Sequence, residues 1–255
     1  MTALLRTEGI KKSFGGVHAL NGAAIEVEEG TVAGLIGPNG SGKTTLFNVI
    51  TGYERPDEGQ VYFDDRVLTN AAPDKVFAAG IGRTFQLTRI FARLTVLENM
   101  LVAAQTKDRP RNLLAWFGRD AWTHQRRHAM ELLQFVGIER HADVLAGSLS
   151  YGQRKLLELA YVLVADPRVI LLDEPAGGVN PTLVNHIADR IRELNSRGKT
   201  FLVVEHNMEF VMGLCSTITV LESSAVAASD PPQLIRTDKR VLDTYLGADL
   251  EEDPR

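Results

Sequence analysis

The sequence predicts an α/β protein in which a parallel sheet with flanking helices carries an antiparallel β subdomain and an inserted α-helical subdomain. Three observations predict this class. Residues 31–37 (TVAGLIG) are almost continuously apolar and lead through a glycine loop into a helical pattern, which is typical of a strand buried on both faces. Residues 168–206 give strand, helix and strand in turn, an order that indicates parallel pairing. Between about 90 and 165 the apolar residues recur at helical spacing.

The first eighty residues have mostly the pattern of strands. Alternation of apolar and polar residues between glycine or proline positions predicts three strands, in LLRTEGI (4–10), AAIEVEE (23–29) and GQVYFDDRVL (59–68). The run KTTLFNVITG (43–52) predicts a short helix that ends at Gly52.

The rest of the chain alternates helices and strands. Helical spacing covers TVLENMLVAAQ (95–105), DAWTHQRRHAMELLQFVGI (120–138) and LSYGQRKLLELA (149–160). Strands are predicted in RVILLDE (168–174), FLVVEH (201–206) and TITVLES (217–223), and a helix in 180–198 with Gly198 as its stop signal. We therefore expect one domain over 1–255, with an α/β core and β subdomain in 1–88 and 166–246, a helical subdomain in 89–165 and a polar tail in 247–255.

The bulk properties exclude several classes of protein. With 255 residues the chain can bury one sizeable core, and its net charge of −4 disfavours nucleic acid as a partner. A single cysteine, Cys215, allows no internal disulfide and fits a reducing cytoplasm. No apolar run has the length of a signal peptide or a membrane span. Any relation to a membrane is therefore expected to run through a partner or the protein surface.

Residues 37–44 read GPNGSGKT and match the pattern G-x-x-x-x-G-K-[ST]. Glycines let successive main-chain N–H groups turn inward around an anion, and the following helix directs its positive end at it. Lys43 is expected to reach the β- and γ-phosphates and the Thr44 hydroxyl to bind Mg²⁺. An ordinary glycine turn is the alternative, but a buried strand before the motif and a helix after it favour nucleotide binding. The expected binding residues here are Gly37, Pro38, Asn39, Gly40, Ser41, Gly42, Lys43, Thr44 and Thr45.

A second candidate feature is the pair of carboxylates, Asp173 and Glu174, that ends the strand RVILLDE. In an open parallel sheet, ligands bind beyond the carboxyl ends of the strands, and the glycine loop lies at such an end too. We expect the two strands to be neighbours, which puts Asp173 beside Mg²⁺ and Glu174 where a water attacks the γ-phosphate. The alternative is that both residues only mark a strand-to-turn boundary.

A second glycine-containing helix start lies at 149–153 (LSYGQ), more than a hundred residues after the first. Its free N–H groups suit an anion, although an ordinary N-cap by Ser150 is the simplest explanation. The order of the motifs changes that balance. GPNGSGKT, GRTFQ (82–86), LSYGQ, VILLDE (169–174) and VVEH (203–206) follow one another as in the ATP-binding subunits of ABC transporters, which the chain resembles over essentially its whole length.

The resemblance implies a P-loop NTPase core that binds ATP and Mg²⁺ and hydrolyses ATP. Two such subunits, identical or similar, would pair head to tail so that the LSYGQ stretch of one covers the ATP held by the other, through Ser150, Gly152 and Gln153. The implied catalytic residues are Glu174, His206, Gln86 and Lys43, the implied metal ligands are Thr44, Gln86 and Asp173, and Phe14 would stack on adenine. Plain structural roles remain the alternatives: a strand end for Gln86, capping or core packing for His206, and packing for Phe14.

A narrower resemblance is to subunits that serve importers of branched-chain and polar amino acids. It rests on FGGVHAL (14–20), IGPNGSGKTTLFNVITG (36–52), GIGRTFQLTRIF (80–91) and PAGGVNP (175–181). It implies membrane permease subunits as partners, a solute-binding protein as an indirect one, and a peripheral place on the cytoplasmic face of the plasma membrane. Importers of urea or short-chain amides use similar subunits. Tyr161 and Asn180 depart from the pattern, where relatives carry arginine and aspartate.

Two other functional classes stay open. A soluble ABC ATPase of DNA repair or translation would usually carry tandem ATPase halves or long coiled coils, which the sequence lacks. A P-loop kinase would have no use for LSYGQ. The basic segment 107–128, with Trp116, Phe117 and Trp122, is interpreted as a solvated face whose aromatic residues turn into the helical core, with lipid headgroups as the alternative ligand.

Overall fold

The computed structural model describes residues 3–84, 90–107, 119–239 and 241. Gln86, Trp116, Phe117 and the predicted tail 247–255 lie outside these residues. In the described part of the chain, no helix combines the length and apolar character that crossing a bilayer requires.

The N-terminal part forms a four-stranded antiparallel sheet. Its strand order is β2 (Val17–Glu28), β1 (Ala3–Phe14), β4 (Glu58–Phe63), β5 (Arg66–Val67). The single strand predicted over 59–68 is wrong, because the chain turns back at Asp64 and Asp65, whose φ angles are 53° and 58°. Two residues with positive φ give the type of two-residue turn that matches the twist of a hairpin, and the sequence pattern does not distinguish such a turn from two exposed strand positions.

Within the described residues, the larger sheet has six strands. Their order is β10 (Ala225–Asp230), β9 (Thr217–Glu222), β3 (Val32–Ile36), β8 (Thr200–Val204), β7 (Val169–Asp173), β6 (Ile81–Arg83), and all pairs are parallel except β9 with β10. Every residue of β3, β7 and β8 is buried, as predicted for strands covered on both faces.

The predicted adjacency of the two motif strands is wrong. β8 lies between β3, which leads into the glycine loop, and β7, which ends in Asp173. The apolar strand β8 is buried on both faces and pairs along its length with β3 on one side and β7 on the other. Because all three strands are parallel, their carboxyl ends still meet at one edge of the sheet, and the insertion adds the residues that follow β8 to that edge.

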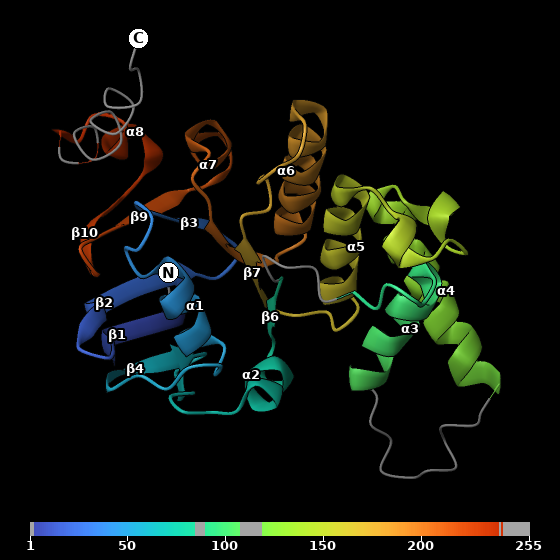
Figure 1. The fold of residues 1–255 in the computed structure, drawn as a ribbon, viewed down its shortest axis with the longest axis horizontal. Coiled ribbons are helices and arrows are strands. Elements are labelled where there is room, and N and C mark those ends of the chain that lie inside the picture. The colour runs from blue at the N-terminus through green and yellow to red at the C-terminus, as the bar shows by residue number, and fades with distance from the viewer. Residues whose placement is uncertain (1–2, 85–89, 108–118, 240, 242–255) are drawn as a thin grey trace.

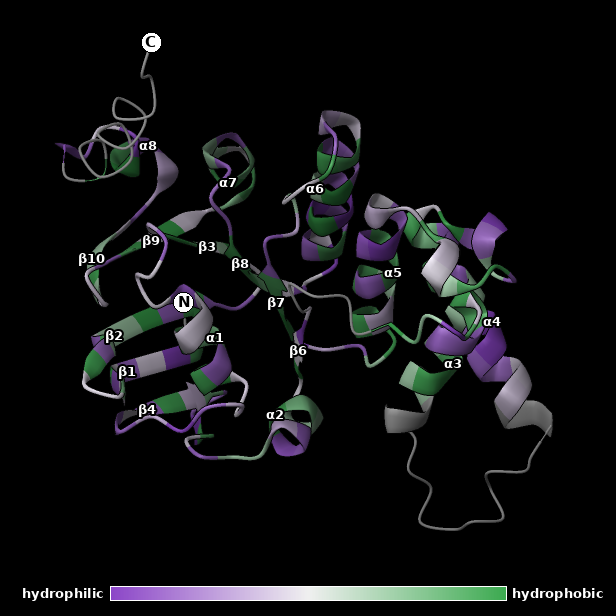
Figure 2. Ribbon diagram, in the orientation of Figure 1, coloured by the Kyte–Doolittle hydropathy of each residue, from purple (hydrophilic) through white to green (hydrophobic). Residues whose placement is uncertain are grey.

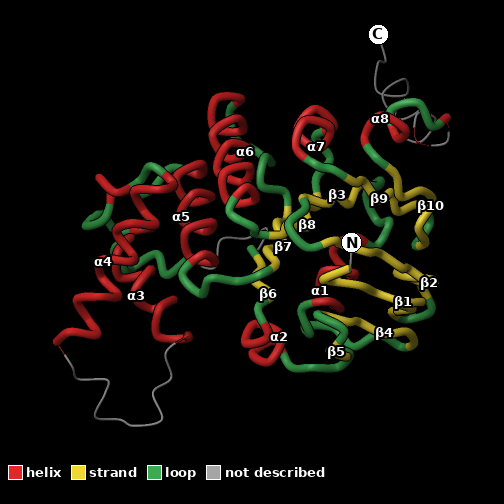
Figure 3. Tube along the Cα trace, turned by 180° about the vertical axis from the view of Figure 1, so that it is seen from behind, coloured by secondary structure: helices red, strands yellow, loops and turns green. Residues whose placement is uncertain are grey.

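Helices cover both faces of the larger sheet (Figures 1 and 3). α1 (Lys43–Ile50) lies between the two sheets and shares one apolar core with them. A second core on the opposite face takes in α6 (Pro181–Ser196), α7 (Met208–Leu214) and the helical part of the chain. Figure 2 shows apolar residues concentrated in the central strands between these layers. Three helices were not identified by the sequence interpretation: α7, α2 (Pro73–Ala79) and α8 (Pro232–Ile235). Of these, α2 and α8 lie at the periphery.

The helical part contains α3 (Val96–Lys107), α4 (Arg119–Val136) and α5 (Tyr151–Leu163), close to the predicted ranges. Trp122 in α4 is 55% exposed, with the guanidinium of Arg126 5.9 Å from its ring centroid. The interpretation that the aromatic residues of 107–128 turn into the core is therefore wrong for Trp122. The residue lies on the polar side of an amphipathic helix, where an arginine one turn away stacks on it.

Candidate nucleotide site

The glycine loop between β3 and α1 has a backbone that only glycine fits. A Cβ atom at Gly37 would lie 2.2 Å from the carbonyl oxygen of Leu221, and one at Gly42 would lie 2.4 Å from that of Ala19. Gly42 also has a φ of 102° at the N-cap position of α1, a conformation that L side chains rarely adopt. Around Gly40 the space is open. The loop is thus packed against the protein at its two ends and accessible in its middle.

Two polar groups of the loop fit a bound triphosphate. The Lys43 ammonium donates hydrogen bonds of 2.8 Å to the carbonyl oxygens of Gly37 and Pro38, which hold it across the loop. Burial lowers the pKa of Lys43, while Glu174 and Asp173 act to raise it. The buried Ser41 hydroxyl has no hydrogen-bond partner among the described residues. Buried polar groups normally have a partner, so this hydroxyl fits a loop that binds a polar ligand. The exposed Thr44 lies in the first turn of the following helix.

The carboxylate of Asp173 is buried at the end of β7 and is held in place. Its Oδ2 lies 3.0 Å from Nη2 of Arg83, and its main-chain N–H donates to the Thr84 hydroxyl at 3.2 Å. Arg83 also donates to Asn48 Oδ1 at 2.7 Å and Thr51 Oγ1 at 3.1 Å, so one guanidinium joins β6, β7 and α1. The sequence interpretation quoted Arg83 within GRTFQ but gave it no role. The signal that could have identified Arg83 is an arginine at the end of a short strand, in a sheet where another strand ends in two carboxylates.

The carboxylate of Glu174 faces the residue predicted to act with it. Glu174 Oε1 lies 3.9 Å from Nδ1 of His206, which directly follows Glu205 at the end of β8. The Glu205 carboxylate, with no exposed surface, accepts hydrogen bonds from the N–H groups of Ala176, His206 and Asn207 at 2.6, 3.1 and 3.2 Å. Glu205 therefore fixes the loops that carry Glu174 and His206. It was not predicted, although an acidic residue that ends an apolar strand just before a candidate histidine is a recognisable pattern.

The structure thus brings four of the predicted residues to one sheet edge: Lys43, Asp173, Glu174 and His206. Phe14 ends β1 with 46% of its surface exposed and the Lys12 ammonium 5.2 Å from its ring, so a face of the ring is accessible. The predicted role of Gln86 stays a prediction, because the residue lies outside the described part of the chain.

The second helix start, at Ser150, is built as a capping box. The Ser150 hydroxyl accepts from the Gln153 N–H at 3.3 Å, and Gln153 Oε1 accepts from the Ser150 N–H at 2.9 Å. Ser150 therefore does act as an N-cap, as the simplest explanation of this helix start proposed. Ser150 and Tyr151 are nevertheless exposed at the surface. Figures 1 and 3 show α5 and α1 on opposite sides of β6 and β7. Helix α5 and the helix that follows the glycine loop therefore lie on different sides of these two strands.

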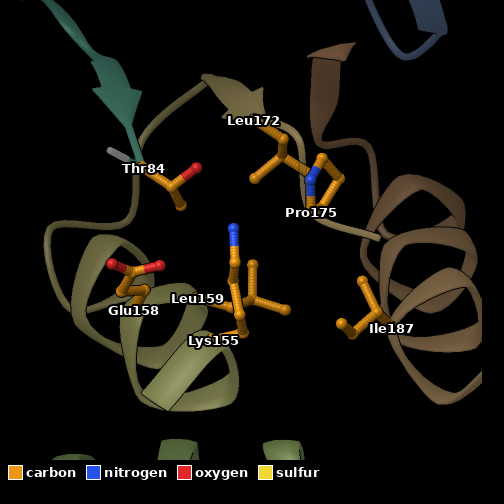
Figure 4. A pocket seen from close by; sticks show the side chains of 7 residues that line it. All are labelled: Thr84, Lys155, Glu158, Leu159, Leu172, Pro175 and Ile187. Carbon is orange, nitrogen blue, oxygen red and sulfur yellow. The ribbon is translucent and has the colours of Figure 1, made fainter. Parts of the chain in front are cut away.

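Behind this edge, a small cavity of about 20 Å³ holds two buried charged side chains, Lys155 and Glu158 of α5 (Figure 4). That volume suffices for one water molecule. Burial raises the pKa of Glu158 to about 7, against the lowering influence of Lys155. Within the described ranges, Glu158 Oε1 has no hydrogen-bond partner.

Glu158→Gln should stabilise the protein at alkaline pH and make little difference at acidic pH. In the unfolded chain this carboxyl has a pKa near 4.5, and in the folded chain near 7. The folded state therefore holds the proton more tightly, and stability is lost as pH rises from 4.5 through 7, by at most about 3 kcal/mol. Thermal unfolding between pH 5 and pH 8.5 should show the variant gaining over the wild type as pH rises. A gain that is the same at every pH, or one shared by the exposed control Glu26→Gln, would contradict this assignment.

Comparison with known proteins agrees with the geometry of the site. The profile of the family described as ABC transporter matches residues 20–177. The chain is 37% identical over 249 residues to the high-affinity branched-chain amino acid transport ATP-binding protein BraF of Pseudomonas aeruginosa, covering 96% of this chain and 98% of that one. The crystal structure of the ADP conformation of MJ1267, an ATP-binding cassette of an ABC transporter, covers 97% of this chain and 100% of its own, with a TM-score of 0.85 and 36% identity. The dimeric post-hydrolysis structure of the cassette MJ0796, bound to ADP and Pi, gives a TM-score of 0.79 at 26% identity and covers 89% of this chain and 98% of that one.

Proposed function

We propose, from the premise that this chain belongs to the ABC transporter family, that it is the ATP-hydrolysing subunit of an importer for branched-chain or related amino acids. It would act at the cytoplasmic face of the plasma membrane, attached to separate permease subunits. The convergence of Lys43, Asp173, Glu174 and His206 on one sheet edge carries the proposal of ATP hydrolysis. The full-length identity to BraF supports the solute class.

Each residue of the edge has a defined task in this mechanism. Lys43 holds the terminal phosphates against the glycine loop and neutralises charge that builds up on them. Glu174 accepts the proton of the attacking water or orients it. His206, 3.9 Å from Glu174 Oε1, would donate a hydrogen bond to the γ-phosphate.

The residues also fit a magnesium ion. Mg²⁺ usually binds one or two carboxylates together with phosphate oxygens and water. Thr44 and Asp173 would hold the ion here, with Gln86 as the predicted third ligand. Arg83 binds Oδ2 of Asp173, and the second carboxylate oxygen would be the one that binds the metal. When bound, the ion neutralises charge on the phosphates.

A second subunit would give the exposed helix start at Ser150 a function. The dimeric cassette MJ0796 supports pairing of two such chains. In the proposed dimer, Ser150 and Gly152 of one subunit close over the nucleotide of the other, so the catalytic arrangement is complete only when ATP has drawn the subunits together. The free chain is therefore expected to hydrolyse ATP slowly. Closing and reopening would drive alternating access in the permease, which binds the solute delivered by a solute-binding protein.

Deletion of the gene, followed by uptake measurements, tests the solute class. Cells without the protein should lose uptake of labelled leucine, and the wild-type gene should restore it, whereas a gene with Glu174→Gln should not. Tagged protein should sediment with the membranes of cells that contain the permease. Retained leucine uptake with loss of urea or amide uptake would support the alternative importer, and protein that never sediments with membranes would support an ATPase uncoupled from transport.

A further inference from the structure

Helix α5 links two places that the proposed dimer assigns to different nucleotides. Ser150 caps α5 and would face the partner's ATP, while Lys155 lies about one turn further along the same helix. The Lys155 Nζ donates a hydrogen bond of 2.9 Å to the main-chain carbonyl of Glu174, the residue that would activate water at the chain's own ATP. One turn of helix therefore separates the partner-facing end from a direct contact with the catalytic residue.

The burial of Lys155 points to a positioning role rather than to packing. Only 8% of the residue is exposed, and Figure 4 shows its side chain running between Leu172, Pro175 and Thr84, with Glu158 on the same helix. Burying a cation costs several kcal/mol unless it is paired and hydrogen-bonded. An apolar side chain would fill this space with a smaller desolvation penalty. The hydrogen bond to the Glu174 carbonyl therefore explains why a lysine is present here.

The carbonyl that Lys155 binds belongs to a residue in a strained conformation. Glu174 has a φ of 49°, in the left-handed region that non-glycine residues occupy only when their surroundings hold them there. Its N–H donates to the Val204 carbonyl at 2.9 Å, and its own carbonyl also accepts from the Gly177 N–H at 3.1 Å. These two hydrogen bonds and the one from Lys155 fix the backbone of Glu174, and the backbone determines where the carboxylate points.

Tyr151, the first residue of α5, adds a second contact with the same segment. A Cβ atom at Gly178 would lie 3.1 Å from the Tyr151 ring, so the ring packs directly on the turn after Glu174. The Lys155 ammonium lies 5.7 Å from the centroid of that ring. The N-terminal part of α5 therefore holds the segment 174–178 at two points.

We propose that Lys155 is a positioning residue through which α5 couples the two ATP sites of the dimer. When the Ser150 end of α5 closes on the partner's nucleotide, Lys155 carries that displacement to the backbone of Glu174 and sets its carboxylate for the chain's own nucleotide. The inference rests on the proposed function, because it requires a partner's ATP at Ser150. The hydrogen bond of Lys155 goes to Glu174 and its ring contact is with Tyr151, and neither residue belongs to the glycine loop. The chemical step should therefore respond to removal of Lys155, and ATP binding should not.

Steady-state hydrolysis by the full-length Lys155→Met variant tests the coupling. We expect kcat to decrease about tenfold with KM for ATP within about twofold of the wild type. Lys155→Arg, which keeps a cationic donor, should recover kcat to within about threefold of the wild type. Dimer formation is compared by size-exclusion chromatography with ATP, using the Glu174→Gln variant and the double variant Glu174→Gln, Lys155→Met. Both proteins should form dimers equally readily.

Controls separate this role from a packing defect. Leu159→Met changes another residue that lines the cavity while conserving volume, and its kcat should match the wild type. If thermal unfolding shows that Lys155→Met does not fold, Lys155→Gln, which is too short to reach the carbonyl, should give the same loss of kcat. Unchanged kcat, or a lower kcat accompanied by a raised KM and reduced dimer formation, would overturn the inference. A wild-type protein that does not hydrolyse ATP would instead overturn the proposed function.

Discussion

Glu174→Gln is expected to reduce ATP hydrolysis by about a hundredfold to ten-thousandfold, the range of a lost general base, while ATP still binds. The amide keeps the size and the hydrogen-bonding reach of the carboxylate but cannot take up a proton. Because Lys43 and the glycine loop are unchanged, ATP should still draw two subunits together, and without hydrolysis the dimer should persist. Phosphate release measures the first effect, and size-exclusion chromatography with and without ATP measures the second.

The matched control for this variant is Glu26→Gln, which makes the same chemical change at an exposed position of β2. It should hydrolyse ATP at the wild-type rate and show no trapped dimer. A Glu174→Gln protein that remains monomeric with ATP would refute the idea that nucleotide joins the subunits. One that hydrolyses normally would move the proton acceptor elsewhere, with His206, 3.9 Å away, as the next residue to test.

Most of the fold could be predicted because its signals are local. The buried strands β3, β7 and β8 are short apolar runs with polar ends. Helix α6 is capped by Asn180, whose side chain accepts a hydrogen bond from the Leu183 N–H at 2.9 Å. Asn180, one of the two positions that depart from the pattern of the resemblance, thus acts as an N-cap. Such features depend on residues a few positions apart, so the sequence pattern alone contains them.

The order of strands could not be predicted in the same way. Nothing in TFLVV (200–204) says whether β8 lies beside β7 only or between β7 and β3. Sheet order depends on which long-range pairing buries most apolar surface, and every buried parallel strand has much the same composition. The error left the site prediction intact, because any order of parallel strands brings their carboxyl ends to the same edge.

Lys43, Asp173, Glu174 and His206, which the sequence predicted, lie at the carboxyl edge of the sheet, and the missed residues are those that hold this edge in place. Arg83, Lys155 and Glu205 act on Asp173, on the Glu174 backbone and on the loop beyond it. Their partners lie 90, 19 and 29 residues away along the chain. A motif marks residue types at fixed spacing, whereas these supporting contacts are set by how α5, β6 and β8 pack around β7.

Ser150→Arg is the second change with a large expected effect, since it should abolish hydrolysis in a dimer of identical variant chains. The bulky cation would stand where the helix start must approach the partner's nucleotide, and it also removes a hydroxyl that caps α5, a loss of about 1 kcal/mol. Ser150→Asn serves as the control, because asparagine keeps the cap and is much smaller than arginine. It should retain stability and lose far less activity.

Mixing two inactive variants distinguishes a shared site from a site within one chain. Lys43→Ala destroys the glycine-loop half of a site, and Ser150→Arg destroys the half that covers it. If each site combines the loop of one subunit with the helix start of the other, a mixed dimer holds one site with both defects and one with none. Equal amounts of the two proteins should then regain activity, with about a quarter of the wild-type rate as the upper limit, because half of the dimers are mixed and each has one intact site. Coupling of the two sites through Lys155 would lower the regained rate below that limit. If Ser150 served its own chain's nucleotide, every site in the mixture would carry one defect and the activity would stay at the level of the separate variants.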